Sequence, residues 1–146
     1  MENSPRLTVE LVWEDADLEE LAIVADNGQY RGVATVYFGL GDVALMANAL
    51  RGFPKSISQR EIFSGGSEDG DNSYAQLVFY CTDDVGHTAI DVTLSECLFS
   101  QRRRSKRNRV ELLLRFEPGA LDTFCHELDG IARRLKTSAL LHGIAA

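Results

Sequence analysis

The chain has 146 residues, of which 45% are hydrophobic and 25% are charged, a composition typical of a globular protein with one domain. This composition excludes a disordered tail, a collagen-like fibre and a disulfide scaffold. The 22 acidic residues outnumber the 15 basic ones and give a net charge of −7. Such a charge favours cationic partners and disfavours nucleic acid and anionic lipid.

The cysteine pattern and the N-terminus predict a cytoplasmic protein. The three cysteines are an odd number without C-x-x-C spacing, so a reducing compartment is the simplest setting. The first residues lack the basic and apolar regions of a signal peptide. No apolar run approaches the roughly 18 residues that a membrane-spanning helix needs, so we expect no membrane crossing.

Alternating hydrophobic residues predict three antiparallel strands in the first half of the chain, over residues 7–13, 21–25 and 30–38. An Asn-Gly pair before the third strand is typical of a tight hairpin. The buried side of the first strand is expected to carry Leu7, Val9, Leu11 and Trp13.

A helix is predicted over residues 43–50, with Asp42 as its N-cap. Gly52 and Pro54 end this helix. Ile57, Ile62 and Phe63 favour a short edge strand, and the glycine- and serine-rich residues 64–73 favour a loop.

The pattern then repeats, with strands predicted at residues 74–81, 88–94 and 110–116. A second helix begins after Glu117 and has apolar residues at the spacing of one helical face. Its stripe consists of Leu121, Phe124, Cys125, Leu128, Ile131 and Leu135.

These elements predict an α+β protein with one curved antiparallel sheet of about six strands and two helices on one face. We expect a single domain, 1–146, built from two β-β-β-α half-repeats at about 6–54 and 73–137. Phe38, Gly41, Leu50 and Gly52 recur 78 residues later as Phe116, Gly119, Leu128 and Gly130. Both an ancient duplication and a repeated steric solution at the strand–helix joint explain this match.

The predicted register places apolar and tyrosine side chains on the sheet face opposite the helices. A semi-apolar sheet face often binds a partner, so this face predicts a homodimer. Its residues are Val33, Tyr37, Tyr74, Val78, Tyr80 and Leu113.

Acidic residues cluster between the first two strands, directly after the single tryptophan. Clustered carboxylates accelerate association with a basic protein, and an exposed indole can anchor it. A solvated hairpin turn is the alternative for the same residues. The candidate partner-binding residues are Trp13, Glu14, Asp15, Asp17, Glu19 and Glu20.

A second charged segment holds six of the basic residues before the last predicted strand. It is a candidate anion-binding loop for a phosphate ligand or a nucleic acid. No aromatic residue is interleaved, which favours a solvated loop instead. The residues concerned are Arg102, Arg103, Arg104, Lys106, Arg107 and Arg109.

No catalytic residues, metal site or cofactor are predicted. The G-x-G-x-x-A pattern at residues 39–44 resembles a dinucleotide-binding turn, but Asp42 places negative charge where a phosphate would bind. Cys125 and His126 are neighbours on a helix and point in different directions, so they cannot form a nucleophile–base pair.

The order of elements, together with the turn at residues 38–42, the helix end at 50–54 and the helix start at 116–121, resembles a group of small bacterial proteins that includes WapI-type toxin-immunity proteins. The resemblance implies an antiparallel sheet with two helices and inhibition by binding. We therefore expect a non-catalytic, immunity-like protein that binds a basic partner through its acidic surface. The alternatives are phosphate or nucleic-acid binding through residues 102–109, and a small-molecule enzyme that uses the cleft between sheet and helices.

Overall fold

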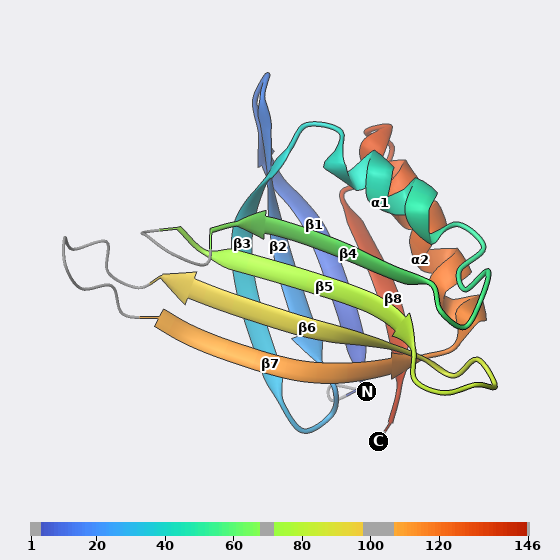
Figure 1. Cartoon of the computed structure of the whole chain (residues 1–146). Coiled ribbons are helices and arrows are strands. Elements are labelled where there is room, and N and C mark those ends of the chain that lie inside the picture. Colours follow the sequence, from blue (N-terminus) through green and yellow to red (C-terminus); the bar gives the residue numbers. More distant parts are fainter. Residues whose placement is uncertain (1–3, 68–71, 98–106, 146) are drawn as a thin grey trace.

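The computed structural model describes residues 4–67, 72–97 and 107–145, and over these residues the chain forms eight strands and two helices (Figure 1). In chain order they are β1 (Arg6–Glu14), β2 (Leu18–Asp26), β3 (Arg31–Gly39), α1 (Asp42–Leu50), β4 (Arg60–Gly66), β5 (Tyr74–Cys81), β6 (Thr88–Cys97), β7 (Arg107–Phe116), α2 (Pro118–Ala132) and β8 (Ser138–Ile144).

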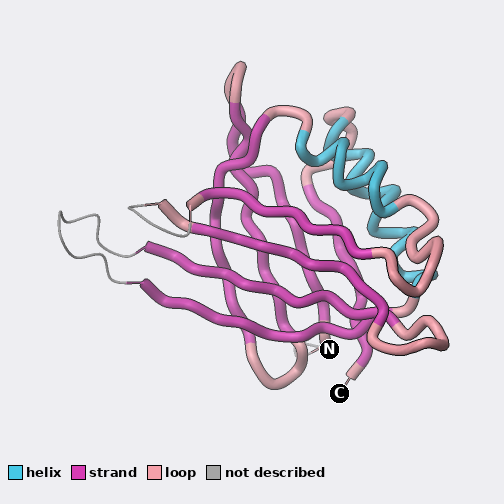
Figure 2. The backbone as a smooth tube through the Cα atoms, viewed as in Figure 1, coloured by secondary structure: helices cyan, strands magenta, loops and turns pink. Residues whose placement is uncertain are grey.

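The strands form one antiparallel sheet in the order β3-β2-β1-β8-β7-β6-β5-β4. Strand β8 joins two arms of this sheet, since it pairs with β1 along five residues but with β7 only through Arg115↔Ile144 and Phe116↔Gly143. The short joint lets the sheet fold over, so that the first arm (β3, β2, β1, β8) crosses the second arm (β7, β6, β5, β4) steeply (Figures 1 and 2). Strand β3 contacts all four strands of the second arm.

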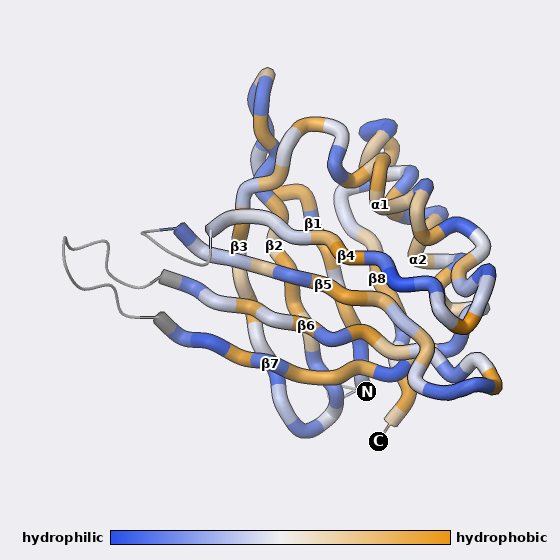
Figure 3. The backbone as a smooth tube through the Cα atoms, viewed as in Figure 1, coloured by the Kyte–Doolittle hydropathy of each residue, from blue (hydrophilic) through white to orange (hydrophobic). Residues whose placement is uncertain are grey.

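The hydrophobic core fills the space between the two arms and beneath the helices. Buried and more exposed residues alternate along β2 and β3, as period-two burial requires, and hydrophobic residues occur along the strands of both arms (Figure 3). The two helices lie side by side, and α2 packs against β8 while α1 contacts β4 (Figure 2). Their buried stripes are Val43, Met46, Ala47 and Leu50 in α1 and Leu121, Phe124, Cys125, Leu128 and Ile131 in α2.

The predicted α+β class with an antiparallel sheet and two helices is confirmed, but the predicted number of strands is wrong. The sheet has eight strands rather than about six, because β4 is a full strand and because β8 follows α2. Residues 64–66, predicted as part of a loop, belong to β4 and pair with β5. Strand β8 is short, yet its Ala139 and Leu141 are fully buried in the hydrophobic core, and the strand packs against α2.

The start of α1 also differs from the prediction. Gly41, not Asp42, is the N-cap residue, and its φ of 94° lies in the left-handed region that favours glycine. The Asp42 carboxylate instead accepts a hydrogen bond of 2.8 Å from the backbone N–H of Gly39. Asp42 therefore fixes the turn between β3 and α1 rather than the first N–H groups of the helix.

A close approach between the two arms depends on a glycine in β4. A Cβ atom at Gly65 would lie 2.6 Å from the ring of Phe38, which is itself buried. In Gly65→Ala either the ring or the strand must move, and overpacking of this kind costs about 2 kcal/mol. We expect urea denaturation to show a loss of stability of about that size.

Gly119→Ala is the matched control, because a Cβ atom at Gly119 would meet nothing within 4 Å. This residue lies in the first turn of α2, where alanine is the better helix former by up to about 1 kcal/mol. Equal unfolding midpoints for the two variants would contradict the described contact between β3 and β4.

Candidate functional site: the acidic hairpin

The end of the β1–β2 hairpin, residues 12–20, is called here the acidic hairpin, and a bulge in β1 decides which of its side chains face solvent. The β1–β2 register shifts between Leu11 and Trp13, so Val12 is an extra residue. After it, Trp13 lies opposite Glu20 and Glu14 lies opposite Glu19. The prediction that Trp13 shares the buried side of the strand is therefore wrong, because one extra residue reverses the alternation.

Trp13 lies on the outer face of the first arm, where it contacts Tyr37 of β3. The two ring centroids are 6.1 Å apart and the rings meet edge to face at 84°. Trp13 is 46% exposed and Tyr37 is 44% exposed. Between them on β2 lies Glu20, which pairs with Trp13 on one side and with Tyr37 on the other.

The acidic hairpin projects beyond the rest of the sheet (Figure 1), and its turn is held by hydrogen bonds. Asp15 Oδ1 accepts bonds of 2.8 Å from the backbone N–H groups of Asp17 and Leu18. These bonds lower the pKa of Asp15, which keeps its carboxylate ionised. The carbonyl of Asp17 accepts a further bond from the N–H of Leu40, which fixes the turn to the end of β3.

On its other side the acidic hairpin is bound to the end of α2 through Arg134. The Arg134 guanidinium donates to Glu14 Oε2 at 2.8 Å through Nε, to Glu19 Oε2 at 2.7 Å through Nη2, and to the Ile131 carbonyl at 2.8 Å through Nη1. Each of the three nitrogens thus donates to one acceptor, which uses three of the five N–H groups. Burial lowers the pKa of Arg134, but the bonds to Glu19 and Glu14 outweigh it and raise the pKa above its ordinary value.

Glu19 is an incompletely satisfied buried carboxylate. It is only 2% exposed, and among the described residues its Oε1 atom has no hydrogen-bond partner. A buried polar atom without a partner is rare in proteins and costs free energy, so it needs an explanation. Arg134 satisfies Oε2 alone.

A cavity of about 400 Å³, with Glu19 among its lining residues, lies between the acidic hairpin, the start of α1 and the end of α2. We call it the Glu19 cavity. Its charged lining consists of Glu14, Asp15, Glu19 and Arg134, and its other lining residues are Leu40, Gly41, Val43, Ala44 and Ala132.

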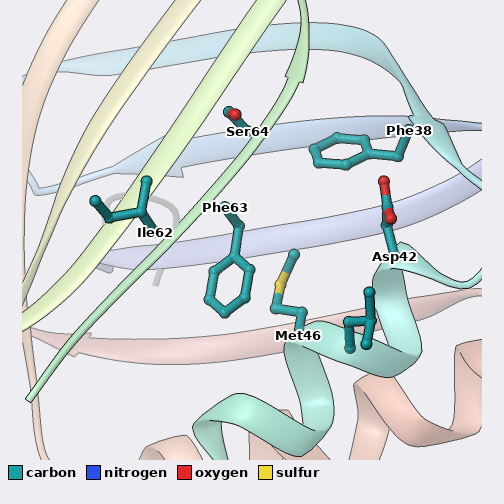
Figure 4. A pocket seen from close by; sticks show the side chains of 7 residues that line it. Phe38, Asp42, Met46, Ile62, Phe63 and Ser64 are labelled. Carbon is teal, nitrogen blue, oxygen red and sulfur yellow. The ribbon is translucent and has the colours of Figure 1, made fainter.

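A second cavity, of about 260 Å³, lies between α1 and the edge strand β4, which is the cleft that an enzyme hypothesis would use (Figure 4). Its polar side chains are Asp42 and Ser64; the rest of its lining is Phe38, Leu45, Met46, Ile62 and Phe63. The Asp42 carboxylate already accepts the Gly39 N–H. The cavity therefore offers an apolar surface with one engaged carboxylate and one hydroxyl.

The residues predicted as a dimer face do not lie on one face. Val33 and Tyr37 are on the outer side of the first arm, whereas the other four residues are on the outer side of the second arm. Those four are Tyr74, Val78, Tyr80 and Leu113. The inward side of β3 faces β7, where a Cβ atom at Gly32 would meet the Val110 side chain, so the outer sides of the two arms point away from each other.

On the second arm, Val78 is buried and Tyr80 is engaged by a neighbour. The Tyr80 hydroxyl donates to Asp91 Oδ1 at 2.8 Å. Burial, together with this hydrogen bond, raises the pKa of Tyr80 to about 12. This face is therefore less free to bind than its sequence suggests.

Of the candidate anion-binding residues, Arg102, Arg103, Arg104 and Lys106 lie outside the described residues. Arg107 and Arg109 lie in the first part of β7. The Nε of Arg109 donates to Glu111 Oε2 at 3.0 Å.

The described cysteine and histidine residues form no reactive pair. Burial raises the pKa of the Cys125 thiol to about 11, so little thiolate forms near neutral pH. His87 pairs with Asp83 in the exposed turn between β5 and β6. Within the described ranges, no group of three or more His, Cys, Asp or Glu residues could hold a metal ion, and no helix is long and apolar enough to span a membrane.

Comparison of the chain with protein-family models, with curated proteins and with solved structures finds no match. The likeness to WapI-type immunity proteins therefore stays a prediction.

Arg134 was not among the residues predicted for the site, although the sequence contains a signal for it. Leu21 and Ile23 face the core, so two residues earlier Glu19 must point inward as well, and a buried carboxylate requires a cation. Arg134 occupies a left-handed conformation, with φ of 62°, at a position after α2 where glycine is usual. Its ion pairs offset this strain.

Arg134→Gly tests this balance of forces. Glycine removes left-handed strain of about 1 kcal/mol, but it leaves Glu19 buried without its cation, which costs about 3 to 5 kcal/mol. We expect a net loss of stability of about 3 kcal/mol in urea denaturation, since the cost of the unpaired Glu19 carboxylate is larger than the strain that glycine removes.

Two further variants separate the buried pair from the exposed one. Adding Glu19→Leu to Arg134→Gly removes the unpaired charge and should restore most of the lost stability. Glu14→Gln breaks a half-exposed pair and should cost less than about 1 kcal/mol. An Arg134→Gly protein as stable as the wild type, or a double variant no better than the single one, contradicts this account.

Proposed function

We propose that this chain is a non-catalytic protein-binding module that binds a basic protein through its acidic hairpin. The observation that carries the proposal is the exposed Trp13–Tyr37 pair, which lies among carboxylates on a projecting hairpin whose turn is fixed by hydrogen bonds. The resemblance to WapI-type immunity proteins suggests the same class of function, in which a toxin is neutralised by being covered.

The aromatic pair has the properties of a binding anchor. Tryptophan and tyrosine are enriched among residues that dominate interface energies, because they bury a large area with little loss of side-chain entropy. Here both rings are already in contact and about half exposed, so a partner would find them in place. Val12 and Leu18 are also exposed on the same hairpin and extend its apolar surface.

The surrounding charge selects the kind of partner. Five acidic residues occur between positions 14 and 20, and Arg134 compensates only the pair that faces α2. Asp15, Asp17 and Glu20 form no ion pair among the described residues. Such a potential attracts a cationic surface, accelerates association at low salt and repels acidic proteins.

Site-specific photo-cross-linking tests this proposal. A photoreactive phenylalanine replaces Leu18 on the acidic hairpin, and in the matched control it replaces Leu113 on the outer side of the second arm; both residues are exposed. In the cell that makes the protein, we expect position 18, and not position 113, to cross-link a protein with a high isoelectric point.

With the cross-linked partner purified, Asp17→Lys combined with Glu20→Lys should slow association at low salt at least tenfold and have much less effect at high salt. Cross-links only from position 113, an acidic partner, or a second copy of this chain captured at position 18 would refute the proposal. So would association rates that the charge reversal leaves unchanged.

A further inference from the structure

We infer that the open edge of β4 binds an extended segment of another protein as an added strand, with one apolar side chain of that segment in the cavity between α1 and β4. Strand β4 is the last strand of the sheet, and within the described residues it pairs with β5. Its other edge can therefore pair with the backbone of a further strand, which is a common mode of peptide recognition. The inference goes beyond the proposed function, because it concerns another surface and depends on backbone hydrogen bonds rather than on surface charge.

The register of β4 shows which of its backbone groups point toward this edge. In an antiparallel pair the N–H and C=O groups of successive residues point to opposite sides, so bonded and non-bonded positions alternate. The N–H of Ser67 donates to the carbonyl of Ser73 just beyond the paired residues of β4 and β5. Counting back in steps of two, Phe63 also bonds to β5. Ile62 and Ser64 therefore direct their N–H and C=O groups away from β5, to the open edge.

The other end of β5 gives the same alternation. The N–H of Thr82 donates to the carbonyl of His87 at 2.7 Å, just beyond the last residue pair of β5 and β6. Even-numbered residues of β5 therefore bond to β6, and odd-numbered residues bond to β4. At the open edge, no described residue forms a hydrogen bond with the backbone of Ile62 or Ser64. Their two N–H donors and two carbonyl acceptors have the spacing that one extended strand would meet.

A cavity of about 260 Å³ lies beside these backbone groups, since Ile62 and Ser64 are among its lining residues (Figure 4). Its apolar wall includes Phe38 and Met46, which are buried, and Phe63, which packs against the core. This volume is below the roughly 300 Å³ at which pockets for whole small-molecule ligands begin. It suits one apolar side chain instead, and alternate side chains of an added strand point to the same side.

The charge on the cavity wall selects the bound segment. Asp42 lines the cavity, and the hydrogen bond that its Oδ2 accepts from the Gly39 N–H holds the carboxylate there. A negative charge at this position favours lysine or arginine next to the apolar side chain and repels an acidic segment. Exposed edges are usually blocked by lysine or proline, and residues 61–65 of β4 contain neither. Ile62 is 52% exposed, and Leu45 on the α1 side of the cavity is 65% exposed, so both can contact the segment.

Peptide display tests the inference on the full chain. Random nine-residue peptides are selected against the immobilised protein, and the affinity of each selected peptide is then measured by isothermal titration calorimetry. We expect the selected peptides to carry an apolar residue beside lysine or arginine. N-methylation of every second peptide amide should weaken binding at least tenfold, whereas N-methylation of the amides in between should not, because only alternate groups face β4. No selected binder, or equal sensitivity at all amides, would overturn the inference.

Two variants of one residue locate the bound peptide. Ile62→Pro removes an N–H that the pairing with β5 does not use, so we expect an unchanged fold and peptide binding at least tenfold weaker. The matched control Ile62→Val keeps the N–H and should bind like the wild type. A folded Ile62→Pro protein that binds the peptide as tightly as the control refutes a site on this edge.

Amide hydrogen exchange of the wild type gives a readout that needs no variant. In the free protein, the amides of Ile62 and Ser64 should exchange faster than that of Phe63. A selected peptide should slow both at least tenfold and should shift the methyl NMR signal of Met46 on the cavity wall. An Ile62 amide already protected in the free protein, or a Met46 signal that the peptide leaves unchanged, contradicts the inference. Photo-cross-linking from Leu18 does not involve β4, so the proposed function and this inference can fail separately.

Discussion

The position of one additional residue in β1, Val12, sets the chemistry of the acidic hairpin. Side chains alternate along a strand, so an extra residue moves every later side chain to the opposite side. Without the bulge, Trp13 would point inward with the core residues, and Glu14 would point into solvent. With it, the indole is exposed beside Tyr37, and Glu14 and Glu19 meet one cation on the inner side. The exposed Trp13–Tyr37 pair and the Arg134 ion pairs at the Glu19 cavity both follow from this reversal of the side chains after Val12.

The side of the acidic hairpin that faces α2 is constrained in a different way, because it buries the charged Glu19 carboxylate. A buried ion pair contributes little net stability, yet removing one partner is costly, so such a pair acts mainly to specify position. Arg134 has an unfavourable left-handed backbone conformation, and its ion pair with Glu19 joins the end of α2 to the acidic hairpin, which is far away in sequence. This ion pair holds the projecting hairpin in place, and a binding surface that is already ordered loses less entropy when a partner docks.

Periodicity predicted most of the fold and part of the site. The strands of both halves, both helices and the acidic hairpin could be found because alternation and helical spacing depend on local burial. Strand β8 was missed because its short alternating run follows a helix end and resembles a tail, and β4 was shortened because Gly65 and Gly66 resemble loop residues. The Val12 bulge, the folding of the sheet over itself and the Arg134–Glu19 pair depend on contacts between distant segments. Local patterns carry no record of these contacts, which is why Trp13 and the predicted dimer face were misplaced.

The fluorescence of Trp13 reports both the exposure of the indole and the charge around it, since this is the only tryptophan in the chain. Its fluorescence can be quenched by caesium and by iodide at matched ionic strength. We expect both ions to reach the indole. When the quenching by each ion is divided by its quenching of free N-acetyltryptophanamide, we expect the larger value for caesium, because the surrounding carboxylates concentrate cations. The difference should shrink in a variant with Asp17→Asn and Glu20→Gln. An indole shielded from both ions would contradict the bulge, and an exposed indole that prefers iodide on the same relative scale would contradict the acidic binding surface.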